Sequence, residues 1–266
     1  MKIAVVGDVH VISDHDPYKN LHVRRAFFKS CWPSFQHLLK KVNDEAPDLV
    51  ILLGDLVDWF SHENMVFGLD LLADLHSPWY MTPGNHDIAV PTVGYAQNMY
   101  QTEATRDYLS NWSKQGVDLS TRVIELDGCH VILLDSAMSN LNEGDEVFLA
   151  QVLENAKMPL LFTHVPVDLP ETRDYILSVD SRRNMSKYVL SGSPNLYPHH
   201  IKGRIPHVFS GHLHFAGNLE CDATRFHLCN MGITMYDPHR DQSAIAQATL
   251  IEGQPNALSF RQITVV

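Results

Sequence analysis

Hydrophobic residues occur along this chain mainly in short runs bounded by Gly, Pro, Asp or Asn. Brief runs rich in Val, Ile, Leu and aromatic residues are typical of buried strands. Six such strands are predicted up to Phe209, at Ile3–Val6, Leu49–Leu53, Trp79–Met81, Val131–Leu134, Leu160–Phe162 and His207–Phe209. Three more follow, at Thr224–Cys229, Ala246–Ile251 and Leu258–Val265, with turns such as Glu252-Gly253 and Pro255-Asn256 between them. The later strands predict a mostly antiparallel end to the sheet system.

Segments with apolar residues at helical spacing separate the earlier strands. The longest is Leu21–Glu45, in which Pro33 is expected to break or kink the helix. Met65–Leu75 has the apolar stripe of an amphipathic helix, and Arg106–Trp112 and Val147–Leu153 are shorter candidates. Alternation of strands and helices predicts an α/β layered core.

The chain contains no internal repeat and no clear linker, so we expect one domain over all 266 residues. Weak periodicity and several turn residues, among them Pro170, Gly192 and Pro198, mark the stretch between His164 and His207. Long loops inside compact domains are often functional. We therefore predict a surface loop or partial cap beside the active site, at about residues 165–206.

Composition narrows the class of protein. Hydrophobic residues make up 45% and charged residues 19% of the chain, as in ordinary globular proteins. The formal net charge of −11 argues against a broad nucleic-acid or anionic-membrane surface, because such surfaces are bound by Lys and Arg. No apolar run reaches the roughly 18 residues that a membrane span needs. The sequence does not indicate an oligomeric state.

Two further features bear on cellular location. The four cysteines, Cys31, Cys129, Cys221 and Cys229, form no CxxC pair, which predicts free thiols in a reducing compartment. A Cys221–Cys229 bridge across a hairpin is the alternative. The apolar stretch at the N-terminus is too short for a signal peptide, and cleavage would remove the polar residues that follow it. We expect a cytoplasmic protein.

Polar side chains that suit metals follow five of the predicted strands. These are Asp8 and His10, Gly54-Asp55, Gly84-Asn85-His86-Asp87, His164, and Gly211-His212-Leu213-His214. Ligand sites in α/β proteins form at the carboxyl ends of strands, so the five ends are expected to converge on one cleft. Carboxylate, imidazole and amide oxygen without thiolate suit Mn, Fe or Zn. A pair of such ions would clamp a phosphoryl group and share a bridging hydroxide.

The five blocks, in this order, resemble those of the calcineurin-like metallophosphoesterase superfamily. The resemblance implies a four-layer αββα sandwich, with two mixed sheets flanked by helices. It implies a first divalent ion held by Asp8, His10 and His214, and a second held by Asn85, His164 and His212. Asp55 would bridge the two ions, His86 would assist departure of the leaving oxygen, and Asp87 would orient His86.

Each block also has an ordinary structural interpretation. A Gly-Asp-Leu-Val-Asp segment can be a turn in which Asp58 caps the next helix, and Gly-Asn-His-Asp can be a tight turn. Taken jointly, these interpretations require five coincidences in the right order. Trp59-Phe60 is either core at the start of a helix or an aromatic wall beside Asp55 that stacks on the substrate.

Departures from particular subfamilies narrow the substrate. The protein Ser/Thr phosphatases of the superfamily have Arg and Glu where this chain has Trp59 and Asp87. The DNA-repair nucleases usually carry an additional domain, for which the residues after His214 leave little room. The closer resemblance is to compact bacterial phosphodiesterases and phosphatases, including class III cyclic nucleotide phosphodiesterases.

The charge of the blocks favours a phosphodiester over a monoester. A dianionic monoester usually needs extra cationic donors, and no Arg or Lys lies inside the five blocks. Arg182, Arg183 and Arg204, in or near the predicted loop, are the candidates for such donors. The partner is therefore expected to be a small phosphorylated substrate. The alternatives are a phosphomonoesterase, a nucleotide pyrophosphatase, or a scaffold that has lost catalysis.

Overall fold

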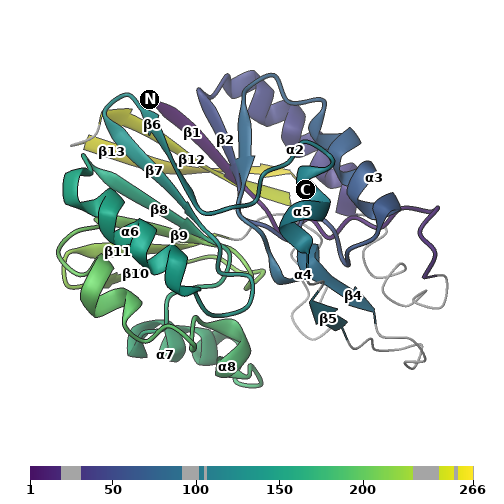
Figure 1. Ribbon diagram of the computed structural model, residues 1–266. Helices are drawn as coiled ribbons and strands as arrows, with labels where there is room; N and C mark the ends of the chain where they lie inside the picture. Colours follow the sequence, from purple (N-terminus) through teal and green to yellow (C-terminus); the bar gives the residue numbers. More distant parts are fainter. Residues whose placement is uncertain (19–30, 92–101, 105–106, 230–245, 255–256, 266) are drawn as a thin grey trace.

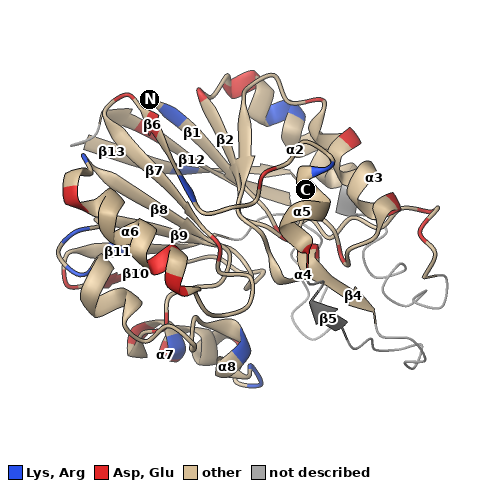
Figure 2. Ribbon diagram, viewed as in Figure 1, with Lys and Arg blue, Asp and Glu red and all other residues tan. Residues whose placement is uncertain are grey.

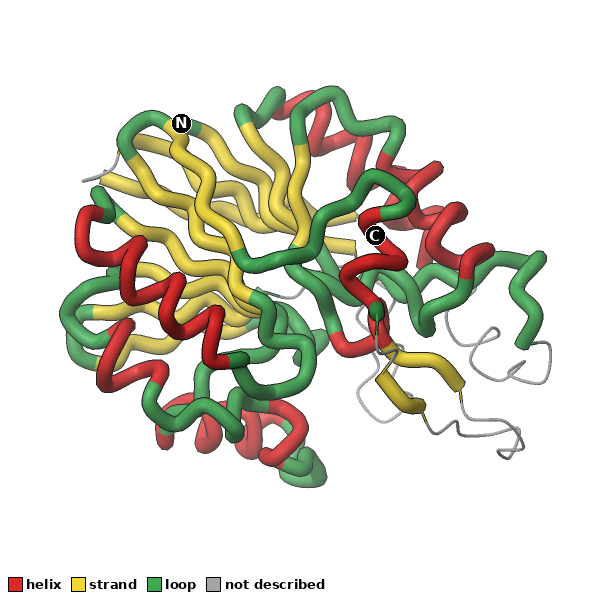
Figure 3. Tube along the Cα trace, in the orientation of Figure 1, coloured by secondary structure: helices red, strands yellow, loops and turns green. Residues whose placement is uncertain are grey.

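The computed structural model describes residues 1–18, 31–91, 102–104, 107–229, 246–254 and 257–265. In this part of the chain the strands form two larger sheets and a small two-stranded sheet, β4 (Ala89–Pro91) with β5 (Thr102–Ala104). The two larger sheets pack face to face, and helices cover their outer sides (Figures 1 and 3). The expected sandwich of two mixed sheets flanked by helices is confirmed.

The first sheet has the strand order β13-β12-β1-β2-β3. Its strands are β1 (Lys2–Val6), β2 (Leu49–Leu52), β3 (Trp79–Met81), β12 (Ala246–Gln254) and β13 (Ala257–Val265). The first three run parallel, whereas β12 is antiparallel to both β1 and β13. The carboxyl ends of β1, β2 and β3 therefore lie at one edge of the sheet.

The second sheet has the strand order β10-β11-β9-β8-β7-β6. Its strands are β6 (Arg122–Leu126), β7 (Cys129–Leu134), β8 (Pro159–Thr163), β9 (His207–Ser210), β10 (Gly217–Cys221) and β11 (Thr224–Leu228). The four central strands are parallel, and β6 and β10 pair antiparallel at the edges. The predicted antiparallel finish is therefore right for β12 and β13, whereas β11 is parallel to β9 and antiparallel to β10, a strand that was not predicted.

The helices begin where local sequence favours them. They are α2 (Cys31–Glu45), α3 (His62–Leu72), α4 (Asn85–Ile88), α5 (Tyr108–Ser113), α6 (Glu143–Asn155), α7 (Pro170–Val179) and α8 (Met185–Tyr188). Ser61 caps α3 and Asn142 caps α6 through their side-chain oxygens. A π-helical turn, Tyr197–Ile201, follows α8.

Some predicted boundaries need correction. The amino-terminal part of the predicted helix Leu21–Glu45 lies outside the described residues, and Pro33 falls in the first turn of α2, where its missing N–H costs no hydrogen bond. The stretch 165–206 is not an irregular loop, because it contains α7, α8 and the π-helical turn. The turn predicted at Glu252-Gly253 is instead part of β12, and Gly253 pairs with Leu258.

The central strands of the second sheet have two apolar faces because each face packs into a different hydrophobic cluster. Val131 and Leu133 of β7 belong to the main cluster between the sheets, together with Phe162 and Phe209. Residues of opposite parity, such as Ile132, pack under α6 and the segment 165–206. Strands buried on both sides read as continuous apolar runs, which is why these strands were recognisable.

The cysteine pattern agrees with free thiols. Cys129, Cys221 and Cys229 are unbonded, and Cys221 at the end of β10 pairs with Thr224 rather than facing Cys229. The alternative Cys221–Cys229 bridge is therefore wrong. Within the described residues, none of the helices combines the length and the apolar character needed to span a bilayer.

Candidate metal centre

The seven candidate ligands come together where the two sheets meet. Asp8 and His10 follow β1, Asp55 follows β2, and Asn85 follows β3 at the start of α4. His164 follows β8, and His212 and His214 follow β9. Both sets of parallel strands therefore point their carboxyl ends at one cluster, as the strand positions predicted.

The backbone of this cluster is held in an uncommon conformation. The φ angles are 47° at Asp8, 53° at His10, 51° at Asp55, 71° at His212 and 59° at His214. A non-glycine residue in this left-handed region stores strain, and such residues concentrate at functional sites. Five of the ten described non-glycine residues with positive φ are therefore candidate ligands of the cluster.

Two motif glycines allow the loops after β2 and β3 to touch. A Cβ at Gly84 would lie 2.1 Å from Asp55 Oδ1, and one at Gly54 would lie 2.4 Å from the Gly84 nitrogen. Gly54 also has a φ of 85°. A larger residue at Gly84 would displace Asp55, and one at Gly54 would displace the backbone of Pro83 and Gly84, so close packing of the two loops explains both glycines.

The first group of ligand atoms consists of Asp8, His10, Asp55 and His214, which all approach one another within 4.8 Å. His10 Nε2 lies 3.0 Å from His214 Nε2 and 3.6 Å from Asp55 Oδ2. His214 Nε2 lies 3.9 Å from Asp8 Oδ1. Asp8, His10 and Asp55 are at most 1% exposed.

The second group shares Asp55 with the first. It contains Asp55, His164 and His212, again within 4.8 Å, and Asn85 joins it. His164 Nε2 lies 3.3 Å from Asp55 Oδ2, 3.1 Å from Asn85 Oδ1 and 3.1 Å from His212 Nδ1. Asp55 Oδ2 thus faces both groups.

The donor chemistry fits a cation in each group. The outer nitrogens of three histidines are engaged: His10 Nδ1 at 3.0 Å from Asp58, His164 Nδ1 at 2.6 Å from the Leu53 carbonyl, and His212 Nε2 at 2.9 Å from the Lys187 carbonyl. Each outer nitrogen then donates, which leaves the inner nitrogen of a neutral ring as an acceptor. Converging acceptors repel one another unless a positive ion sits between them.

The pKa values show how the metal-free protein offsets this repulsion. Burial alone would raise the pKa of Asp55, but His164 and His86 outweigh it and hold that pKa well below its usual range. Burial alone would lower the pKa of His164, but Asp55 raises it to about 9. Burial and nearby His164 lower the pKa of His212 to about 3. A proton on His164 therefore balances Asp55, and a bound metal would displace it.

His86 is oriented by a residue that sequence reasoning did not select. His86 Nδ1 lies 2.7 Å from the carbonyl oxygen of Asp58 and 3.5 Å from its carboxylate. The Asp58 carboxylate also lies 3.0 Å from His10 Nδ1. Asp58 thus contacts both a candidate metal ligand and the candidate acid. Its place in the Gly-Asp-Leu-Val-Asp block is the available signal in the sequence, where a helix cap is the role considered for Asp58.

Asp87 has a different role from the one predicted. Its carboxylate accepts backbone N–H groups of Asp55 at 2.7 Å, Gly84 at 2.8 Å and Val57 at 3.2 Å. It therefore ties together the loops after β2 and β3 and does not orient the ring of His86. Burial, followed by the charge of Asp55, raises the pKa of Asp87 to about 7.

A pocket of about 390 Å³ adjoins the cluster at Asn85, His86 and His212. One wall follows β7 and is made by Ala137, Met138 and Ser139. Another part of the lining comes from α8, with Ser186, Lys187 and Tyr188. The Tyr188 ring lies 5.1 Å from the ring of His212, so the segment 165–206 borders the cluster directly.

The three predicted arginine contacts do not line this pocket. The side chain of Arg182 is 71% exposed and is ion-paired with Asp180. Arg183 also pairs with Asp180, lies over the Tyr188 ring at 4.3 Å, and donates to the Leu213 carbonyl. Arg204 is exposed on the surface. Arg183 therefore supports the pocket wall from behind Tyr188. The sequence alone does not show whether an arginine in this segment supports the wall or contacts the substrate.

Trp59 belongs to the core. Its side chain is fully buried, and its indole nitrogen donates to the Asp16 carboxylate at 3.0 Å. Ser61 also donates to Asp16 at 2.5 Å, so Asp16 fixes the entry to α3. The interpretation of Trp59 as core at the start of a helix is right, and the aromatic wall beside Asp55 is wrong.

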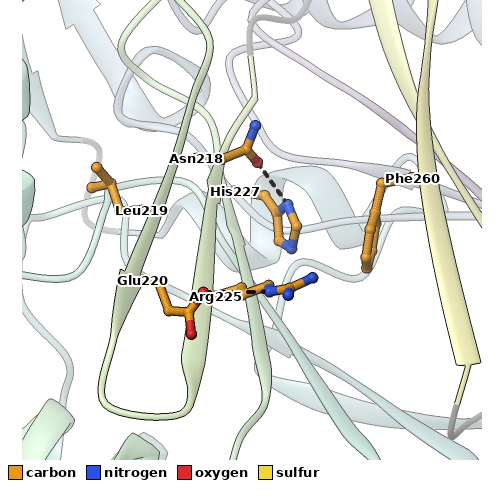
Figure 4. Close-up of a pocket in the computed structure, with 6 residues that line it drawn as sticks. All are labelled: Asn218, Leu219, Glu220, Arg225, His227 and Phe260. Atoms are coloured by element: carbon orange, nitrogen blue, oxygen red, sulfur yellow. Dashed lines mark hydrogen bonds and ion pairs between the residues drawn. The ribbon is translucent and has the colours of Figure 1, made fainter.

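A second hollow, of about 320 Å³, lies where β10 and β11 face β13 (Figure 4). His227 stands between Asn218 and Phe260, and its Nδ1 lies 3.0 Å from Asn218 Oδ1 (Figure 4). Its Nε2 lies 3.2 Å from His207 Nδ1, and its ring stacks on Phe209. Both ring nitrogens of His227 have hydrogen-bond partners, and the ring packs on Phe209 and Phe260. We therefore interpret His227 as a structural residue.

The layered fold and the shared cluster define a class of metal-dependent phosphoesterase. A model of the calcineurin-like phosphoesterase family matches residues 1–216. The chain therefore belongs to the calcineurin-like metallophosphoesterases.

Individual relatives are distant. The chain is 29% identical over 174 residues to a probable glycerophosphodiester phosphodiesterase, GpdQ, from Arcobacter nitrofigilis, with 62% of this chain and 57% of that protein covered. It thus spans little more than half of that relative. It is 27% identical over 222 residues to a probable cyclic nucleotide phosphodiesterase from Fibrobacter succinogenes, covering 80% and 73%. A dimetal phosphatase from Danio rerio shares the fold, with a TM-score of 0.59 and 16% identity over 99% and 98% of the two chains.

Proposed function

We propose that this protein hydrolyses a small phosphodiester with two divalent metal ions. One observation carries the proposal: two groups of converging acceptor atoms share the single carboxylate oxygen Asp55 Oδ2. Two sites joined by a common ligand are the arrangement needed to hold two ions close together. Oxygen and imidazole donors favour Mn, Fe or Zn.

The geometry of the two groups supports the following ligand roles. Asp8, His10 and His214 would hold one ion, and Asn85, His164 and His212 would hold the other. Asp55 would contact both. When bound, the ions would supply a nucleophilic hydroxide at neutral pH and neutralise charge on the phosphate. Leu53, Asp58 and Lys187 fix the ring orientations of the histidines through their outer nitrogens.

His86 would give a proton to the leaving oxygen. Its Nδ1 is engaged by Asp58, its side chain is 23% exposed, and it lines the pocket. When the ring is protonated, Nε2 also carries a proton, which it would give to the leaving oxygen. Asp58 acts through His86 and is a positioning residue.

A diester is favoured over a monoester by the charge of the cluster. The ligand groups contain two carboxylates and no Arg or Lys, so the second negative charge of a monoester has no dedicated partner there. The names of both bacterial relatives describe diester hydrolysis. A phosphomonoesterase is the second candidate.

Cys129, Cys221 and Cys229 are free thiols, which supports our proposal of a cytoplasmic location.

A reconstitution experiment tests the function. The metal-depleted protein is loaded separately with Mn²⁺, Fe²⁺ or Zn²⁺ and assayed with bis(para-nitrophenyl) phosphate and with the para-nitrophenyl monoester. We expect metal-dependent hydrolysis and a higher kcat/KM for the diester. Asp55→Asn should abolish activity, whereas Asp70→Asn, a surface change on α3, serves as the matched control. A clearly higher kcat/KM for the monoester would reverse the substrate assignment.

A further inference from the structure

The pocket beside the cluster contains a cation that the ligand groups do not use. Lys187 of α8 lines the pocket together with Met138 and Ser139. Figure 2, in which Lys and Arg are blue, shows a basic position on α8. The carbonyl of the same residue lies 2.9 Å from His212 Nε2. Lys187 is therefore anchored by its backbone next to the metal centre, while its side chain remains exposed.

Several other cations of the segment 165–206 have an acidic partner, although Arg182 and Arg183 share one. Arg182 and Arg183 are both ion-paired with Asp180, and Lys202 is ion-paired with Asp222 at 3.1 Å. The ammonium of Lys187 has no ion pair with any residue in the described part of the chain. In a chain with a net charge of −11, an uncompensated cation at the mouth of a pocket attracts an anionic ligand.

The wall that presents Lys187 is fixed. Arg183 lies over the Tyr188 ring and donates to the Leu213 carbonyl, while Tyr188 packs against His212. The position of this wall is therefore coupled to the loop that carries His212 and Leu213. A lysine on such a support can select a charge at a defined distance from the cluster.

The charge of a simple diester does not require Lys187. Asp8 and Asp55 are the carboxylates of the two ligand groups, so two divalent ions leave the centre with net positive charge. That positive charge balances one hydroxide and the single negative charge of a diester. The charge of Lys187 is therefore not needed by the scissile phosphate and can pair with a second negative group of the substrate.

We propose that the pocket selects a phosphodiester with a second anionic group on the ester arm that enters it, and that Lys187 binds this group. The arm also contacts an apolar surface, since Ile88, Ala89 and Met138 line the same pocket. Met138 is 55% exposed, so its side chain is accessible to an organic ligand in the pocket. This inference rests on the proposed phosphodiesterase function and names the substrate class of the same site.

Two symmetric substrates test the assignment, because either arm can then enter the pocket. One is bis(para-nitrophenyl) phosphate, and the other carries one carboxylate on each ring. For the carboxylated diester we expect Lys187→Met to lower kcat/KM about tenfold, the effect of losing one partly solvated charged contact. For the uncharged diester the change should stay within about twofold. Lys187→Arg should retain the preference, and Lys202→Met is the matched control.

A binding measurement separates substrate contact from catalysis. The carboxylated para-nitrophenol released from the charged diester is titrated into metal-free protein and followed by NMR. The wild-type protein should bind it more tightly than para-nitrophenol, and Lys187→Met should remove the difference. The preference should also weaken with added salt in the wild-type protein only.

The outcomes are distinguishable. No metal-dependent hydrolysis of either diester would reject the proposed function itself. Normal hydrolysis with equal effects of Lys187→Met on both diesters would overturn the role of Lys187 and leave the function standing. A larger effect on the para-nitrophenyl monoester than on the charged diester would assign Lys187 to the scissile phosphate instead.

Discussion

Replacing His86 with Ala separates catalysis from metal binding. The backbone N–H of His86 donates to Asp55 Oδ1 at 2.9 Å, and this bond survives the substitution. The side chain belongs to neither of the two groups that share Asp55. We therefore expect His86→Ala to keep both metal ions and to fold normally.

The expected loss of kcat is about 10²–10⁴-fold, the usual contribution of a positioned general acid. This corresponds to roughly 3–5 kcal/mol of the activation barrier. The loss should be smallest for a para-nitrophenyl diester, because its leaving group departs without much protonation, and larger for an alkyl diester. The ratio of the two losses therefore reports proton donation specifically.

The assay measures kcat for both diesters together with metal content by elemental analysis. His62→Ala, an exposed position on α3, is the control. His86 also lies near His10 and Asp58 in a third group of potential ligand atoms. Loss of an ion from His86→Ala would make it a metal ligand, and equal losses for both leaving groups would refute proton donation.

Five further substitutions test the positioning of the site and the stability of the fold. Asp58→Asn should lower kcat about 10- to 100-fold, as weakening a partner of a metal-bound histidine does. Asp87→Asn should reduce thermal stability and metal content, because Asn keeps only one of the two oxygens that accept the three backbone N–H groups; a selective loss of kcat in Asp87→Asn would contradict this. Arg183→Ala should destabilise the fold by roughly 1–3 kcal/mol in denaturant unfolding, and exposed Arg182→Ala by less than about 0.5 kcal/mol; equal effects would remove the buttress role. The pKa of His227 is near 6.5 in the unfolded chain, whereas burial and nearby His207 lower it to about 3 in the folded protein. The contribution of His227 to stability is therefore complete above pH 6.5. It decreases as the pH falls below that value, because the unfolded chain then binds a proton that the folded protein does not. At pH 5 the wild-type protein should lose about 2 kcal/mol that His227→Gln does not lose, and identical pH profiles would reject this assignment.

The sequence predicted the ligand cluster because each ligand follows a strand within a few residues. Asp8, Asp55 and Asn85 need only the strand before them to be placed at the edge of the first sheet. The parallel order of β1, β2 and β3 then brings them together. Local pattern and global position agree at these sites.

Other features depend on contacts that local pattern does not contain. Lys187 and Arg183 are four residues apart, yet one lines the pocket and the other supports Tyr188. Their roles follow from where α8 packs against His212, a contact distant in sequence. Trp59 looked available to a substrate because it is near Asp55, but buried Asp16 accepts its indole N–H.

Strand β6 was missed although its signal was present. Arg122–Leu126 has only moderate burial, so it lacks the apolar run of the central strands. Asp127 and Gly128 have φ angles of 47° and 82°, and they turn the chain directly into β7. An Asp-Gly pair between two strand-forming segments is typical of a tight hairpin and would have located the edge strand.

Metal stoichiometry tests the central claim most directly. The chain is depleted of metal, titrated with Mn²⁺, and analysed for bound ion and for phosphodiesterase activity at each step. Asn85→Ala removes a ligand from the second group alone, and His214→Ala removes one from the first. We predict two bound ions per wild-type chain, full activity only when both are present, and weakened binding of a single ion in each variant. Full activity with one bound ion per chain would contradict the two-metal account.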